Sequence, residues 1–322
     1  MAGGGDAMTT TSWLPLIEEY LSVRRGLGFA LETPAYMLRD FARYADALDH
    51  HGPLTTELMV RWALASRSTD RAQAIRRLGA VRQFARYRAL LDPATEVPPA
   101  GLLGRLPRRP QPHIYSDAEL AALLDQASRL LPRRGLRPQT YVAFFSLLAC
   151  TGLRLSEACR LAVADVDLNV GVITVREGKF RKARLVPLHP STIEALARYA
   201  AVRDACCQGP GRFFRTEHAP ALQKDTVEKT FGRLRYRLGW TAHGRARQPR
   251  IHDLRHSFAV RRLLRWYETG ADLDRKLLAL SLYLGHAHVS DTYWYLTGVP
   301  ELMAIAAERF ERFAQAEQGG EL

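Results

Sequence analysis

The stretch from Asp92 to Pro112 constrains the fold of this chain more than any other feature, because it separates two parts with different patterns. It is rich in proline and glycine, has no periodic spacing of apolar residues, and carries Arg105, Arg108 and Arg109 among its prolines. Such a composition is typical of a linker. With 322 residues, the chain is long enough for a domain with its own core on each side. The sequence therefore predicts domains at 12–91 and 113–322, a basic linker at 92–112, and a disordered N-terminus at 1–11.

The first predicted domain has the pattern of a helical bundle. Apolar residues recur at three- and four-residue steps in four segments, at about 12–25, 36–48, 55–65 and 69–91. The last segment is unusually basic, and Arg76, Arg82 and Arg86 lie on it. A solvated helix face is the ordinary explanation of such a charge run, and a face that contacts phosphates is the alternative. The spacing by itself leaves both open.

The second predicted domain combines helices with a β-hairpin. Ser116 is a suitable N-cap for a helix that extends to about Ser128, with acidic residues in its first turn. The run from Tyr141 to Cys150 is almost continuously apolar and predicts a buried helix. The fold class predicted is mainly α with a small β-hairpin or sheet. Short strands are predicted at 170–175 and 183–188, and further helices at 190–207, 222–238 and 301–313.

The charge balance favours a polyanionic partner. Lysine and arginine number 46 against 33 acidic residues, which gives a formal net charge of +13 and a pI of about 10.0. A surface of this sign attracts nucleic acid, and a generic basic protein is the alternative explanation.

Cysteine spacing and hydropathy argue against two other classes of protein. The four cysteines show no C-x-x-C or other metal-ligand spacing, so we expect reduced thiols that pack in the fold: Cys150, Cys159, Cys206 and Cys207. No run approaches the roughly 18 apolar residues of a membrane span, and residues 1–11 lack a basic-then-apolar signal pattern. We therefore expect a soluble, intracellular protein with no membrane partner.

The residues that could carry chemistry concentrate near the end of the chain. His252 and Arg255 are three apart, so on a helix they would project from one face and could hold the same anion. Downstream, an L-G-H sequence ends at His286, and Tyr295 follows. An arginine fork, two histidines and a phenol suit a site that grips a phosphodiester while tyrosine oxygen attacks phosphorus.

These residues resemble the signature of the tyrosine recombinase (phage integrase) family. That signature is H-x-x-R-H, then L-G-H, then a tyrosine nine residues after the last histidine, which is the spacing from His286 to Tyr295. Upstream, T-G-L-R-L-S-E at 151–157 resembles the first arginine box of the family, and 178–188 resembles the hairpin that carries its lysine. Four such boxes in family order over roughly 145 residues are a specific signal.

The resemblance implies a fold and a reaction. The expected fold is an N-terminal helical, SAM-like core-binding domain and a C-terminal mixed α/β catalytic domain, which close around duplex DNA. The expected activity is that of a site-specific DNA recombinase of the integrase or transposase type. Such an enzyme cleaves and rejoins strands through a 3′-phosphotyrosyl intermediate, without a metal or other cofactor. The catalytic residues carried over are Arg154, Lys179, His252, Arg255, His286 and the nucleophile Tyr295, with Glu157 and His256 in supporting positions.

The expected roles follow from the chemistry of the family. Arg154 and Arg255 would stabilise the charged phosphate oxygens, and the histidines would add hydrogen bonds, with His252 a candidate acceptor of the tyrosine proton. A general acid in the hairpin must be lysine, because arginine does not release its proton. The family pattern selects Lys179, with Lys182 as the reserve.

The resemblance also implies DNA contacts and an oligomer. The expected partners are double-stranded recombination sites and further copies of the chain in a tetrameric synapse, with accessory or sister recombinases left open. The helix at 301–313 would pack on its own domain or dock on a neighbouring protomer. The expected location is the cytoplasm, in association with the nucleoid. The residues expected to contact DNA are Arg76, Arg82, Arg86, Arg108, Arg109, Lys182, Arg245 and Arg247.

Three alternatives make different predictions. A type IB topoisomerase-like nicking-closing enzyme would share the chemistry but need no second DNA site. A non-catalytic DNA-binding accessory protein of the same fold would have lost catalytic positions, whereas all six are filled here. A zinc hydrolase is disfavoured, because its helix motif has glutamate where Asp253 stands, and Arg255 would lie beside the metal.

Overall fold

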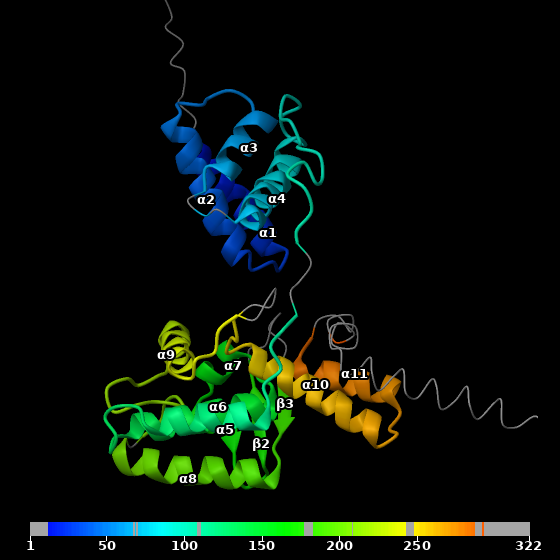
Figure 1. Cartoon of the computed structure of the whole chain (residues 1–322). Helices are drawn as coiled ribbons and strands as arrows, with labels where there is room; N and C mark the ends of the chain where they lie inside the picture. The colour runs from blue at the N-terminus through cyan, green and yellow to red at the C-terminus, as the bar shows by residue number, and fades with distance from the viewer. Residues whose placement is uncertain are drawn as a thin grey trace, which may run out of the picture. The chain divides into compact units, whose positions relative to one another are not determined.

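The chain divides into two compact units, one within Met1–Arg109 and the other within Pro110–Leu322. A computed structural model describes residues 12–66, 68, 70–107, 111–176, 183–207, 209–242, 248–286 and 292 (Figure 1). The division between the units falls inside the stretch predicted as a linker. The predicted fold class, mainly helical with a small sheet, is confirmed.

The described part of the first unit is built on four helices around one apolar core. Ser12, Thr55 and Asp70 act as N-caps, because each side-chain oxygen accepts a hydrogen bond from a backbone N–H of the first turn. The apolar stripes seen in the sequence supply the buried side chains, Trp62 and Phe84 among them. The helices are α1 (Trp13–Gly26), α2 (Glu32–Ala47), α3 (Thr56–Leu64) and α4 (Arg71–Arg88).

A polar cluster ties α4 to the centre of this core. The indole Nε1 of Trp62 donates a hydrogen bond to the Asp40 carboxylate at 3.1 Å. Arg77 stacks its guanidinium 4.1 Å from the centroid of the Trp62 ring and forms an ion pair with Asp40 at 3.2 Å. At least one arginine of the basic helix is therefore a packing residue.

The segment after α4 folds back along that helix. Arg82 Nε donates to the carbonyl of Pro98 at 2.6 Å, and Arg71 Nε donates to the carbonyl of Leu103 at 3.3 Å. Just before the start of α3, the carbonyl of Leu54 accepts a hydrogen bond from the Glu96 backbone N–H at 2.8 Å. The first part of the predicted linker therefore packs on the first unit and covers one side of α4.

In the second unit, α6 is the central helix. It packs against α5, α8 and α10, and nearly all its apolar side chains are buried, as its continuous apolar run predicts. The helix α5 begins at the predicted cap, where Ser116 and Glu119 form a reciprocal capping box. The helices of this unit are α5 (Asp117–Ser128), α6 (Leu136–Thr151), α7 (Leu155–Arg160), the short 3-10 helix η1 (Val163–Asp165), α8 (Pro190–Cys206), α9 (Lys224–Arg237), α10 (Asp253–Glu268) and α11 (Leu273–Leu284).

A small antiparallel sheet lies beside these helices, with the order β1-β2-β3 in the described residues. Its strands are β1 (Val166–Asp167), β2 (Val172–Val175) and β3 (Arg184–Pro187). The predicted hairpin is the β2–β3 pair, and β1 is an addition that its two residues are too short to signal. Ile173 and Val186 face each other across β2 and β3 and are buried, which fixes the register.

The cysteines are free thiols, as predicted, but not all of them are packed in the fold. All four cysteines are free; Cys159 is buried, but Cys150 and Cys206 are exposed, so the expectation of packing is wrong for these two. Among the described residues, no helix combines the length and the apolar character that crossing a membrane requires.

Candidate active site

A tight turn after α6 positions the first predicted catalytic arginine. Gly152 ends α6 with φ of 63°, a backbone conformation that favours glycine. A Cβ built on Gly152 would lie 2.6 Å from Cδ1 of Phe258, so a larger residue would force α6 and α10 apart. The turn then places Arg154 at the N-cap of α7.

Arg154 is held by Glu157, which the resemblance puts in a supporting position. The Arg154 Nη1 donates to the Glu157 carboxylate at 2.8 Å, and the Arg154 backbone N–H donates to the same carboxylate at 2.9 Å. On its other side, Arg154 Nη2 donates to the carbonyl of Gly285 at 2.6 Å. These bonds use two of the five N–H donors of the Arg154 guanidinium, and the Arg154 side chain is 20% exposed.

Glu157 also binds a second arginine, Arg184, which the sequence analysis did not select. The Glu157 side chain is only 1% exposed, and both of its oxygens accept hydrogen bonds from Arg184, at 2.9 and 2.8 Å. Burial raises the pKa of Glu157, but the bonds from Arg184 and then from Arg154 outweigh it and lower the pKa to about 2. Glu157 is therefore an ionised bridge between two arginines.

Arg255 lies on α10 and is almost fully buried, with 3% exposure. Its Nη1 donates to the carbonyl of Gly152 and its Nη2 to the carbonyl of Leu284, both at 2.7 Å. Arg154 and Arg255 thus bind the carbonyls of consecutive residues, Leu284 and Gly285. The structure brings the two predicted arginines together at one turn.

The turn after α11 carries the L-G-H sequence. Gly285 has φ of 65°, and a Cβ there would lie 3.0 Å from Nη1 of Arg184, whose Nε donates to the carbonyl of Tyr283 at 2.8 Å. His286 follows, and its Nδ1 shares a hydrogen bond of 2.7 Å with the hydroxyl of the buried Thr292. This bond orients the His286 ring beside the carbonyls that Arg154 and Arg255 bind.

The remaining predicted histidines lie at the start of α10. His252 is the exposed N-cap residue, and His256 is buried one turn later, with the two rings in an edge-to-face arrangement 4.8 Å apart. The Asp253 carboxylate between them pairs with Arg250 at 2.8 Å. Asp253 therefore serves as a partner of Arg250, which further weakens the zinc-helix interpretation.

Tyr283 is partly buried and packs against the core. Its ring stacks on Phe258 with centroids 5.6 Å apart, and burial raises its pKa to about 12. A phenol in this state is a poor nucleophile, because its anion is disfavoured. We therefore do not count Tyr283 among the candidates for attack.

Several predicted residues lie outside the residues that the structure describes. They are Lys179 and Lys182 of the hairpin, Arg108 and Arg109, Arg245 and Arg247, Tyr295, and the helix predicted at 301–313. Tyr293, two residues before the predicted nucleophile, also lies outside them. Of the arginines predicted on α4, Arg76 and Arg86 are exposed, whereas Arg82 holds the carbonyl of Pro98.

Arg184 is the site residue that sequence reasoning missed, although a signal for it existed. In β3, Arg184 and Val186 are two residues apart and lie on the same face of the strand, and Val186 is buried. An arginine on the inward face of a strand needs a buried carboxylate as its partner. That reasoning indicates a buried acidic partner for Arg184, although it does not say which residue it is.

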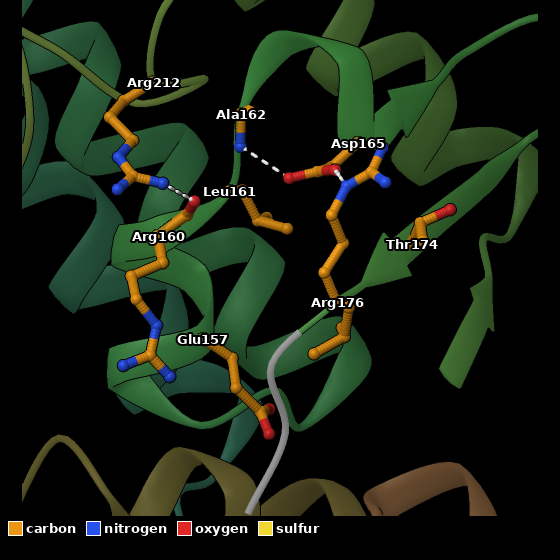
Figure 2. A pocket seen from close by; sticks show the side chains of 9 residues that line it. Glu157, Arg160, Leu161, Ala162, Asp165, Thr174, Arg176 and Arg212 are labelled. Carbon is orange, nitrogen blue, oxygen red and sulfur yellow. Dashed lines mark hydrogen bonds and ion pairs between the residues drawn. The ribbon is translucent and has the colours of Figure 1, made fainter. Parts of the chain in front are cut away.

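Beside Glu157, a hollow of about 280 Å³ opens between α7, η1 and β2 (Figure 2). Arg160, Arg176 and Arg212 line it. Arg176 pairs with the buried Asp165, and the Arg212 guanidinium donates to the carbonyl of Arg160. The hollow lies next to the end of β2. Because three arginines line it, this surface beside the candidate site is basic and suits a polyanion.

The chain is similar to known proteins over most of its length. The model of the phage integrase family matches residues 117–299. The y4rB protein of Sinorhizobium fredii, whose name describes an integrase/recombinase, is 43% identical over 302 residues, which are 92% of this chain and 96% of that protein. Tyrosine recombinase XerC of Erythrobacter litoralis is 30% identical over 308 residues, which are 93% of each chain.

Solved structures show the same fold at lower identity. The Tn1549 transposon integrase in complex with a circular intermediate DNA has a TM-score of 0.65 and 17% identity, over 92% of this chain and 99% of that one. A lambda integrase tetramer bound to a Holliday junction has a TM-score of 0.59 and 18% identity, over 87% of this chain and 76% of that one.

Proposed function

Since this chain belongs to the phage integrase family of tyrosine recombinases, we propose that Arg154, Arg255 and Tyr295 carry out DNA cleavage in its second unit. The chain is a site-specific recombinase that cleaves and rejoins DNA. The observation that carries the assignment of residues is the shared turn, where Arg154 and Arg255 bind the carbonyls of Gly285 and Leu284. Two guanidinium groups fixed at one place form a receptor for a phosphodiester.

Arg154 and Arg255 compensate the negative charge of the phosphodiester, which is the main barrier to the reaction. A phosphodiester repels a nucleophile, and negative charge grows on its non-bridging oxygens in the pentavalent transition state. Arg154 and Arg255 are already oriented by backbone carbonyls, so little reorganisation accompanies the reaction. We assign to His286, which Thr292 orients, and to the exposed His252 the role of adding hydrogen bonds to the same phosphate.

The proton and bond changes balance within the proposed residues. The phenol oxygen of Tyr295 attacks phosphorus and loses its proton, for which His252 is the candidate acceptor. The bond from phosphorus to the 5′ oxygen breaks, and Lys179 protonates that oxygen. The 3′-phosphotyrosyl bond keeps the energy of the broken bond, so a 5′-hydroxyl of a second strand can rejoin without an external energy source.

We assign the substrate and the assembly from the same family membership. The substrate is a double-stranded recombination site, and strand exchange needs two such sites held in a tetramer of this chain. The structure of a lambda integrase tetramer bound to a Holliday junction supports this assembly. Two further expectations belong to the proposal: a helix at 301–313 that docks on a neighbouring protomer, and a cytoplasmic location with the nucleoid.

One experiment separates this function from the alternatives. The purified full chain is incubated with the DNA element that encodes it, and covalent protein–DNA junctions are mapped. We expect attachment to 3′-phosphates at two staggered positions of one sequence, and exchange of strands between two copies of it. Relaxation of supercoiled DNA at scattered positions without exchange would indicate a nicking-closing enzyme. DNA binding without any junction would indicate an accessory protein.

The assignment of Lys179 as general acid predicts a dependence on the leaving group. Lys179→Ala should slow cleavage of ordinary DNA far more than cleavage of DNA whose 5′ bridging oxygen is replaced by sulfur, because a thiolate leaves without a proton. The measurement is the single-turnover cleavage rate on both substrates. Lys182→Ala is the matched control and should slow neither rate selectively. Equal slowing of both substrates by Lys179→Ala would transfer the acid role to Lys182 or to a histidine.

Arg184 is proposed as a positioning residue, because it reaches the site through Glu157 and Tyr283. Arg184→Lys keeps the charge but cannot bind both oxygens of Glu157 in a planar fork. We expect cleavage at saturating DNA to fall roughly a hundred-fold, since small displacements of catalytic groups cost this much, while the Kd for DNA changes little. Arg198→Lys, the same charge-keeping change at an exposed arginine on α8, is the matched control and should alter neither quantity. A change in Kd without a change in rate would make Arg184 a DNA-contacting residue instead.

A further inference from the structure

Tyr115, two residues before the start of α5, is a buried tyrosine that the proposed reaction does not use. It is only 1% exposed, and its ring packs against Trp240 with centroids 5.4 Å apart. Its hydroxyl donates a hydrogen bond to the carbonyl of Arg250 at 2.9 Å. Burial raises the pKa of Tyr115, and the negative charges of Asp253 and Glu119 raise it further. The hydroxyl therefore keeps its proton and stays a hydrogen-bond donor.

The backbone of Tyr115 is held by the middle of α10. Its N–H donates to Oγ of Ser257 at 2.8 Å, and its carbonyl accepts from Nη2 of Arg261 at 2.6 Å. Ser257 and Arg261 are four residues apart, so they are neighbours on one face of the helix. The Ser257 hydroxyl in turn donates to the carbonyl of Asp253 at 2.9 Å. Tyr115 therefore has a fixed position relative to the body of α10.

The side chain of Tyr115 reaches the turn with which α10 begins. In this turn, from Arg250 to Arg255, successive backbone N–H groups bond to carbonyls three residues back, at 3.0 to 3.2 Å. The turn carries the exposed His252. The carbonyl of Arg250, which opens the turn, accepts one bond from the Asp253 N–H and one from the Tyr115 hydroxyl. Tyr115 thus ties the first residue of the turn to the body of α10, and His252 lies between these two points.

Packing and hydrogen-bond satisfaction do not require the hydroxyl of Tyr115. Phenylalanine would fill the same space beside Trp240. The carbonyl of Arg250 already has a partner in the Asp253 N–H, so it would not be left unsatisfied without the tyrosine. What the hydroxyl adds is a second bond that fixes where the turn begins.

We propose that Tyr115 is a positioning residue for His252: its hydroxyl fixes the first turn of α10 and so holds the imidazole where it can accept the proton of the attacking phenol. The inference rests on the proposed function for the role of His252. A general base acts only within hydrogen-bond reach of the proton that it removes. A small shift of the turn therefore lowers the rate of cleavage, although no group that binds the phosphate is lost.

The test uses the full chain and the recombination site found by mapping covalent junctions. Tyr115→Phe removes the bond to Arg250 and keeps the ring. The single-turnover cleavage rate at saturating DNA should fall roughly ten-fold. The Kd for DNA should change less than about two-fold, because Arg154 and Arg255 are held by other carbonyls.

Tyr141→Phe is the matched control. Tyr141 is also 1% exposed, and its hydroxyl is hydrogen-bonded to Thr230 of α9 at 3.1 Å, away from the first turn of α10. Both substitutions remove one buried hydroxyl, so each should lower the Tm by no more than a few degrees. Tyr141→Phe should leave the cleavage rate unchanged. The comparison separates a loss of positioning from a general loss of stability.

A double-mutant cycle tests whether Tyr115 acts through His252. His252→Ala removes the imidazole, so nothing remains for Tyr115 to position. Tyr115→Phe should therefore slow wild-type cleavage roughly ten-fold but cause no further slowing in the His252→Ala protein. A purely structural role of Tyr115 would slow both proteins by the same factor.

The outcomes distinguish this inference from the proposed function. If Tyr115→Phe cleaves as wild type does, or slows wild type and His252→Ala equally, the inference is overturned. If His252→Ala cleaves at the wild-type rate, the inference is overturned as well, while the role of Tyr295 stands. If the wild-type protein forms no covalent junction, the proposed function fails. The NMR signal of the His252 ring in the free protein then decides the inference: it should shift with Tyr115→Phe and not with Tyr141→Phe, and an unchanged signal overturns it.

Discussion

Tyr295→Phe is expected to abolish the covalent protein–DNA adduct while sequence-specific DNA binding is kept. The substitution removes one hydroxyl, which is the attacking oxygen of the proposed mechanism, and leaves Arg154 and Arg255 to hold the phosphate. The measurement is the recovery of protein linked to a nicked duplex after denaturation, beside the Kd for the intact duplex. The expected loss of adduct is complete within detection.

The control is Tyr293→Phe. On a helix, residues two apart point about 200° from each other, so only one of these tyrosines can face the phosphate. Tyr293→Phe should therefore retain the adduct. Recovery of a phosphotyrosyl peptide modified at Tyr293 from the wild-type protein would identify Tyr293 as the nucleophile. It would contradict the assignment of Tyr295, which rests on the spacing from His286.

Glu157→Gln is expected to have the largest effect on stability. The amide keeps the shape of the side chain but removes the charge between Arg154 and Arg184, which leaves two poorly compensated guanidinium groups in a site where Glu157 is nearly fully buried. A pKa lowered from 4.5 to about 2 corresponds to about 3 kcal/mol of folding free energy at neutral pH. Cleavage should fall as well, because Arg154 loses its anchor.

The loss of stability caused by Glu157→Gln is expected to depend on pH. Because the pKa of Glu157 is lowered in the folded state, its contribution to stability is fully present above about pH 4.5 and is lost as the pH falls towards 2. The Tm difference between wild type and Glu157→Gln should therefore be large at pH 7 and shrink below pH 4.5. Asp125→Asn, which removes an exposed carboxylate paired with the exposed Arg129, is the control and should change Tm little. Parallel Tm profiles of wild type and Glu157→Gln from pH 7 to 3 would contradict the bridge.

The sequence predicted those features of the fold that depend on local patterns. Ser116 and Glu119 form the expected capping box, and the apolar run to Cys150 is a buried helix, because caps and hydrophobic periodicity act over a few residues. The pairing of Arg154 with Glu157 was predictable for the same reason, since the two residues share one turn.

What the sequence did not predict depends on contacts between distant segments. Arg184 meets Glu157 only because β3 lies beside α7, and no local pattern states that proximity. The return of the segment after α4 is similar: its prolines and glycines resemble a linker, yet the carbonyls of Pro98 and Leu103 bind arginines of α4. A proline-rich segment without periodicity can be a flexible linker or can pack on a domain through hydrogen bonds of its backbone. Composition does not distinguish these two cases.

The carbonyls that hold Arg154 and Arg255 belong to the backbone, which every residue type provides equally. A side-chain change at this turn therefore releases neither guanidinium as long as the path of the backbone is kept, and the positive φ of Gly285 is part of that path. A shift of the end of α11, in contrast, moves the Leu284 and Gly285 carbonyls together. Arg154 and Arg255 then lose these hydrogen bonds at the same time. Because Gly285 stands ten residues before the proposed nucleophile Tyr295, the phosphate receptor and the nucleophile belong to one short stretch of the sequence.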